Sequence, residues 1–175
     1  MRYASMRNMD ISNGEGLGVS LFVQGCHFHC PNCFNEETWG FNGGKEFTKD
    51  VKWKFFELMN NPRIQRVSIL GGEPLCNENV SDVTKLLYEI RCLKPEINIW
   101  CYTGYNLEDI IYPVALWDAT TITRRTALEM IDVLVDGRYI DKQRDLSLKW
   151  RGSTNQRVIN VQKTLERKEV VLWEK

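Results

Sequence analysis

The chain has 175 residues, of which 43% are apolar and 26% are charged, so it suits one soluble globular domain with a core of its own. Its 23 lysines and arginines balance its 23 aspartates and glutamates, which removes any overall electrostatic reason to bind nucleic acid. The apolar runs are shorter than a bilayer span, and the polar start lacks the apolar centre of a signal peptide, so we expect a cytoplasmic protein without membrane contact.

Four short apolar runs rich in β-branched residues predict strands that are buried on both faces. They lie at residues 17–23, 66–70, 97–102 and 131–135. Between them, apolar residues at helical spacing predict helices. The expected helices are residues 51–60 after a cap at Thr48, a helix capped by Asn79 or Ser81, and the shorter segments 106–111 and 124–130.

Alternating strands and helices predict parallel β/α units in a single domain, 1–175. Beyond residue 138 we expect a polar loop and two late strands, residues 157–161 and 169–173. A full eight-unit barrel takes about 250 residues, so roughly four to six units fit here, either as an open sheet or as a partial, open barrel. In both folds ligands bind at the carboxyl ends of the parallel strands.

The most unusual stretch is GCHFHCPNCFN at residues 25–35, which holds three cysteines and both histidines of the chain. The spacing of Cys26, Cys30 and Cys33, with Pro31 between them, predicts a loop that can surround one compact soft-metal centre. A reducing compartment disfavours a disulfide knot. Two alternatives remain: a zinc site completed by a histidine, and an iron–sulfur cluster with one iron left open.

A second motif, Gly71-Gly72-Glu73-Pro74, follows the second expected strand directly. The glycines allow a sharp turn and a close approach of backbone to ligand, and exposed carbonyls there would accept hydrogen bonds from an ammonium group. Such a turn is common by itself. It gains weight because the cysteine loop, this turn and the segment 103–105 all follow parallel strands and are expected on one rim.

These two motifs in this order resemble the radical S-adenosylmethionine enzymes, and more closely the small activating enzymes of glycyl-radical proteins. The resemblance extends over nearly the whole chain, through the segments DISNGEG, LFVQGCHFHCPNCFN, ETW, SILGGEPL, IWCYTGY, DVLVDGRYI and LKWRGSTNQRV. It implies that the fold is the partial, open (β/α) barrel of the radical S-adenosylmethionine type.

The resemblance also implies a set of ligand-binding residues. Cys26, Cys30 and Cys33 would bind three irons of a 4Fe-4S cluster, and S-adenosylmethionine would bind the fourth iron through its amino and carboxylate groups. The backbone carbonyls of the turn would receive its ammonium group, with Pro74 shaping the turn; this set is Gly71, Gly72, Glu73 and Pro74. No catalytic side chain is assigned.

The adenine contact is implied by the backbone around Asn32, Cys33 and Phe34. Many members of the superfamily carry an aromatic residue just before the third cysteine, where this chain has Asn32. Phe34 or Phe28 would then supply the apolar surface against which the adenine lies.

The implied reaction is the reductive cleavage of S-adenosylmethionine to a 5′-deoxyadenosyl radical, which removes a hydrogen atom from a glycine of an anaerobic ribonucleoside-triphosphate reductase. A one-electron donor such as flavodoxin would reduce the cluster. Residues 138–169 hold nine Lys or Arg against four Asp or Glu, and this segment is our hypothesis for part of the docking surface, with Arg151 and Arg157 as its test positions. The alternatives are activation of another glycyl-radical enzyme, modification of a small molecule, and a non-enzymatic zinc or iron–sulfur module.

Overall fold

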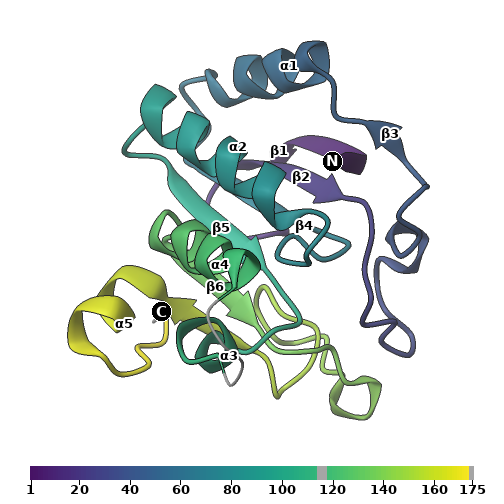
Figure 1. The fold of residues 1–175 in the computed structure, drawn as a ribbon, viewed down its shortest axis with the longest axis vertical. Helices are drawn as coiled ribbons and strands as arrows, with labels where there is room; N and C mark the ends of the chain where they lie inside the picture. Colours follow the sequence, from purple (N-terminus) through teal and green to yellow (C-terminus); the bar gives the residue numbers. More distant parts are fainter. Residues whose placement is uncertain (114–117, 174–175) are drawn as a thin grey trace.

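The computed structural model describes residues 1–113 and 118–173 (Figure 1). Within these residues the strands form one mixed sheet in the order β3-β1-β2-β4-β5-β6-β7. The strands are β1 (Arg2–Asp10), β2 (Gly18–Val23), β3 (Lys45–Glu46), β4 (Arg66–Gly71), β5 (Asn98–Tyr102), β6 (Val133–Asp136) and β7 (Arg157–Asn160).

The four central strands, β2, β4, β5 and β6, are parallel to one another, whereas β1, β3 and β7 pair antiparallel at the two sides. Helices connect the parallel strands: α1 (Lys49–Met59), α2 (Val80–Leu93), and the pair α3 (Leu107–Ile111) and α4 (Ala119–Glu129). After β7 comes α5 (Val161–Arg167), and the loops contain two short 3-10 turns, η1 (Glu36–Thr38) and η2 (Asp141–Gln143). Of the helices described, none has the length and apolar character needed to cross a bilayer.

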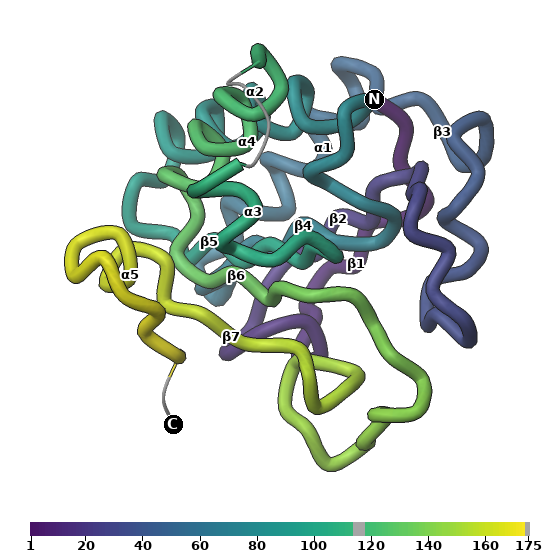
Figure 2. Tube along the Cα trace, turned by 60° about the horizontal axis from the view of Figure 1, so that its bottom comes forward, coloured from purple at the N-terminus to yellow at the C-terminus, as the bar shows by residue number. Residues whose placement is uncertain are grey.

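One face of the sheet carries the main core. Figures 1 and 2 show α1, α2 and α4 on the same side of the strands. Val19 and Leu21 of β2, Val67 and Ile69 of β4, and Ile99 of β5 point to that side and are fully buried. Because successive side chains of a strand alternate between faces, the residues between them point to the opposite side.

The opposite face is partly polar and is covered by loops. Arg66 of β4 is fully buried there, and its Nη2 donates to the main-chain oxygen of Asp10 (2.7 Å). The side chain of Asn13 donates to the Asp10 carboxylate (2.6 Å), and Gly14 passes so close to Trp100 that a Cβ would lie 2.8 Å from its ring. These contacts hold the segment DISNGEG across the sheet.

The structure confirms the four parallel strands and the order of helices between them. One expectation about the ends of the chain is wrong, and elements near both ends were missed. β1 was not expected, and residues 169–173 form no strand, since Leu172 makes only an isolated bridge to Ile159. α5 was also not expected, and α4 begins five residues before the expected 124, because Asp118 caps it by accepting from the N–H of Thr121 (2.8 Å).

Candidate functional site

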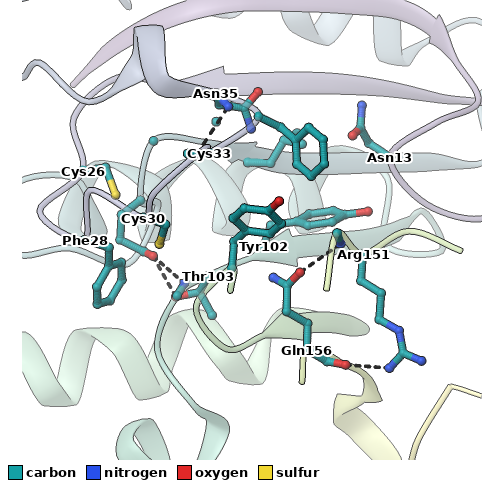
Figure 3. A pocket seen from close by; sticks show the side chains of 18 of the residues that line it. Asn13, Cys26, Phe28, Cys30, Cys33, Asn35, Tyr102, Thr103, Arg151 and Gln156 are labelled. Atoms are coloured by element: carbon teal, nitrogen blue, oxygen red, sulfur yellow. Dashed lines mark hydrogen bonds between the residues drawn. The ribbon is translucent and has the colours of Figure 1, made fainter. Parts of the chain in front are cut away.

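A cavity of about 590 Å³ opens at the carboxyl ends of the parallel strands (Figure 3). Its lining includes all three cysteines of the loop and the first three residues of the glycine turn, which are Cys26, Cys30, Cys33, Gly71, Gly72 and Glu73. The expected convergence of the two motifs on one rim is therefore confirmed. Pro74 and Asn32 lie outside the lining.

The cysteine loop leaves β2 through Gly25, whose φ of 99° is a left-handed conformation that favours glycine. A Cβ at this position would lie 2.2 Å from the ring of Phe41, so the position also lacks space for a side chain. The N–H of Gly25 donates to the carbonyl oxygen of Thr38 (2.7 Å), and the N–H of Cys26 donates to that of Trp39 (3.0 Å). The loop is thus anchored to the residues that follow it.

Main-chain N–H groups point at the sulfur atoms of Cys26 and Cys33. Burial raises the pKa of Cys26, while the main-chain N–H groups of Phe28 and His29 lower it. The N–H of Asn35 donates to Sγ of Cys33 (3.4 Å). Main-chain N–H groups directed at sulfur stabilise its anionic form and are typical of iron–sulfur ligands. All three cysteines are free thiols, so the donor set fits a cluster bound by three thiolates.

The two histidines are engaged elsewhere. Nε2 of His27 lies 2.8 Å from Oε1 of Glu78, and its ring centroid lies 4.5 Å from that of Phe41. The His29 ring centroid lies 4.8 Å from that of Trp39. Among residues 1–113 and 118–173, no three His, Cys, Asp or Glu side chains surround a point as a single metal ion requires. Both histidines thus contact residues outside the cysteine loop, namely Glu78, Phe41 and Trp39.

The glycine turn touches the start of the cysteine loop directly. The N–H of Gly72 donates to the carbonyl oxygen of Val23 (2.8 Å), and the N–H of Glu73 donates to that of Gly25 (2.7 Å). Gly71 has a φ of 105°, and a Cβ on Gly72 would lie 2.4 Å from the Gly25 oxygen. The backbones of the two motifs can approach this closely only because both positions are glycine.

Glu73 is buried behind this turn, and its carboxylate joins the turn to the end of β5. It accepts hydrogen bonds from the hydroxyl of Thr103 (2.8 Å) and from the N–H groups of Gly104 (2.7 Å) and Leu75 (2.9 Å), as Figure 3 shows in part. Burial raises the pKa of Glu73 to about 7, although these donors counteract the rise. Its main-chain oxygen already accepts from the N–H of Cys76 (3.3 Å) and the side chain of Asn79 (3.1 Å).

Of the residues expected near the adenine, Cys33 and Phe34 line the cavity and Asn32 does not. Phe34 lines the cavity and is 53% exposed, with its ring centroid 5.2 Å from that of Tyr139. Asn32 has a φ of 56°, which asparagine tolerates better than most residues, and its side chain donates to Asp141 (2.9 Å). Asn32 thus ties the cysteine loop to Asp141, while the Phe34 ring forms part of the apolar wall of the cavity.

The far wall of the cavity contains residues that we did not assign to the site from the sequence, although Arg151 was expected on the docking surface. It includes Asn13, Tyr102, Trp150, Arg151 and Gln156. Figure 3 shows Arg151 and Gln156 across the cavity from Cys26 and Cys30. All five lie within the segments DISNGEG, IWCYTGY and LKWRGSTNQRV, so the resemblance itself was the signal that would have found them.

Some arginines of the basic segment, residues 138–169, are already bonded to groups within the chain. Arg157 donates to both carboxylate oxygens of Asp136 and also pairs with Glu108, with 2.7 Å between Nη2 and Oε2. Arg151 lines the cavity and donates to the main-chain oxygen of Gln156 (2.6 Å). Arg157 is therefore a structural residue, and a charge reversal there would break its ion pairs with Asp136 and Glu108 rather than report on docking.

Comparisons with known proteins agree with this site. The model of the family described as a 4Fe-4S single cluster domain matches residues 12–159. The chain is 39% identical over 158 residues to the anaerobic ribonucleoside-triphosphate reductase-activating protein of Escherichia coli (strain K12), which covers 89% of this chain and 96% of that protein.

Proteins of the same name show that the relationship is broad. The one from Vibrio cholerae is 35% identical over 89% of this chain and 96% of its own length, and the one from Enterobacteria phage T4 is 33% identical over 90% and 93%. These matches confirm the resemblance that the motifs indicated. The chain belongs to the family of anaerobic ribonucleoside-triphosphate reductase-activating proteins, which are radical S-adenosylmethionine enzymes with a 4Fe-4S cluster.

Proposed function

We propose that this enzyme generates a glycyl radical on an anaerobic ribonucleoside-triphosphate reductase. The observation that carries the proposal is the meeting of the three free thiols and the glycine turn in one open cavity. A reaction on another protein needs a cavity that a loop of that protein can enter. A partial, open barrel would leave such an entrance, and we include that fold, as one domain, in the proposal.

The residues of the rim would hold the two cofactors. Cys26, Cys30 and Cys33 would bind the 4Fe-4S cluster, which supplies the electron that cleaves S-adenosylmethionine. The carbonyls of Gly71 and Gly72 would receive the ammonium group of S-adenosylmethionine. Since the carbonyl of Glu73 already accepts two hydrogen bonds, we assign to Glu73 the role of fixing the turn through its carboxylate.

The adenine would lie against the backbone of Cys33 and the ring of Phe34, both of which line the cavity. Asn32 supports this contact by tying the loop to Asp141. We further propose a cytoplasmic location and a soluble one-electron donor such as flavodoxin.

The test is an anaerobic reconstitution of the whole chain with iron and sulfide, followed by reduction and addition of S-adenosylmethionine and the reductase. We expect a brown protein, 5′-deoxyadenosine, and a glycyl radical signal on the reductase in electron paramagnetic resonance. Cys30→Ala should lower the yields of both products at least about a hundredfold, since one cluster ligand is lost. Cys92→Ala, which changes an exposed thiol on α2, is the matched control and should keep full yields.

The alternatives give different outcomes. If 5′-deoxyadenosine forms and no radical appears on the reductase, the partner assignment is wrong and another glycyl-radical enzyme must be tried. If the chain binds zinc and no cluster, or holds a cluster that does not cleave S-adenosylmethionine, it is a binding module and the enzymatic proposal fails.

A further inference from the structure

The segment 137–145, which follows β6, crosses over the cysteine loop and contacts it through side chains. Nη2 of Arg138 donates to the main-chain oxygen of Phe28 (3.0 Å), and the Arg138 guanidinium lies 4.6 Å from the centre of the Phe28 ring. In Figure 2 the loop that follows β6 extends below the sheet, on the side away from α1 and α2. The loop is thus positioned by residues more than a hundred positions away.

Arg138 is held at a defined place rather than left to move freely. Phe28, the ring on which it rests, is packed edge-on against Tyr105, with centroids 4.9 Å apart. The ring also lies close above Gly104, where a Cβ would come within 2.4 Å of it. A guanidinium that is stacked on a fixed ring and bonded to a fixed carbonyl loses little further freedom.

The charge of Arg138 has no acidic partner within ion-pair distance in the part of the chain that the structure describes. The carbonyl and the ring that Arg138 contacts belong to Phe28, which lies in the cysteine loop between Cys26 and Cys30. By contrast, Arg157 is neutralised by Asp136 and Glu108. An uncompensated positive charge therefore lies against the cysteine loop between its first two cysteines.

We infer that Arg138 is a positioning residue that sets the reduction potential of the cluster, by holding its charge against the loop between Cys26 and Cys30 and by fixing Phe28. The inference rests on the proposed function, since it requires a cluster on the three cysteines. Reduction adds one negative charge to the cluster and its thiolates, and a nearby positive charge favours the reduced form. Arg138 thereby makes the first electron transfer easier.

The test measures the midpoint potential of the reconstituted chain by anaerobic redox titration, with neither S-adenosylmethionine nor reductase present. Leaving both out separates a field effect from any contact of Arg138 with substrate. We expect Arg138→Gln to shift the reduction equilibrium about threefold to tenfold toward the oxidised form, where tenfold corresponds to 59 mV for one electron. The shift should shrink in high salt, because Arg138 is exposed and its charge is screened.

Two further variants separate position from charge. Arg138→Lys keeps the charge and should recover most of the potential. Arg167→Gln removes an equal charge from an exposed position on α5, away from the cysteine loop, and we expect a shift below twofold.

Each remaining outcome decides between the proposals. Equal potentials for the unmodified chain and Arg138→Gln, or equal shifts for Arg138→Gln and Arg167→Gln, would overturn the inference while leaving the proposed function intact. If Arg138→Gln fails to hold a cluster, Arg138→Lys decides, since a potential well below that of the unmodified chain contradicts the role of the charge. An unmodified chain that binds no cluster overturns both proposals together.

Discussion

At the scale of single residues, Glu73 shows how one carboxylate can join two parts of a rim. Its three donors come from the turn itself and from Thr103 and Gly104 after β5. Burial nevertheless raises its pKa from an ordinary 4.5 to about 7. The folded state therefore binds an extra proton between these two pH values, and the contribution of Glu73 to stability is complete below pH 4.5 and is lost as the pH rises through 7.

We predict that Glu73→Gln removes this pH dependence. The free energy of unfolding of the unmodified chain, relative to that of the variant, should fall by about 3 kcal/mol between pH 4 and pH 8. Urea unfolding at several pH values measures the difference. Glu57→Gln, an exposed carboxylate on α1, is the control and should run parallel to the unmodified chain. Parallel curves for Glu73→Gln as well would show that the Glu73 pKa is not raised.

The sequence predicted that the cysteine loop and the glycine turn meet on one rim, because both follow parallel strands. It did not predict that Thr103 and Gly104, about thirty residues further along the chain, donate to Glu73. Nor did it predict that Arg138 contacts Phe28. Such contacts depend on which strands lie next to each other in the sheet. The pattern of residues within one segment contains no information about which distant segment will lie beside it.

At the scale of elements, the contact between the ends of β2 and β4 depends on glycine. We predict that Gly72→Ala lowers the free energy of unfolding by about 1–3 kcal/mol, because its Cβ would lie 2.4 Å from the Gly25 oxygen and the two backbones must separate. Gly40→Ala is the matched control, since no atom lies within 4 Å of the added Cβ, and it should change stability by less than about 0.5 kcal/mol. Denaturant unfolding of both variants measures the two changes in free energy. Equal changes would contradict the close approach of the Gly72 and Gly25 backbones.

The elements that were predicted well and those that were missed differ in burial. β2, β4, β5 and β6 are buried along most of their length, so most of their residues are apolar. β1 has mostly polar, partly exposed residues, and pairing with β2 and β3 makes it a strand. Residues 169–173 have the β-branched composition of a strand, but Lys168 ends α5 in a left-handed conformation and only one bridge forms beyond it.

At the scale of the whole molecule, the sheet connects residues from both ends of the chain. β1 and β3 lie at one side, β7 at the other, and Trp173 packs against Trp100 of β5 with ring centroids 5.8 Å apart. We predict a single cooperative unfolding transition, as expected for one domain. Far-ultraviolet circular dichroism and tryptophan fluorescence should give the same midpoint in urea. Two separate midpoints would indicate two folding units.

The cavity has a further consequence for how the protein is made. Its cysteines lie near the start of the chain, while Trp150, Arg151 and Gln156 of the far wall come about a hundred residues later. Ribosomes add roughly 5–20 residues per second, so the thiols leave the ribosome about 5–20 seconds before the wall that faces them. During that interval the three thiols are present without the residues that face them across the cavity of the folded chain.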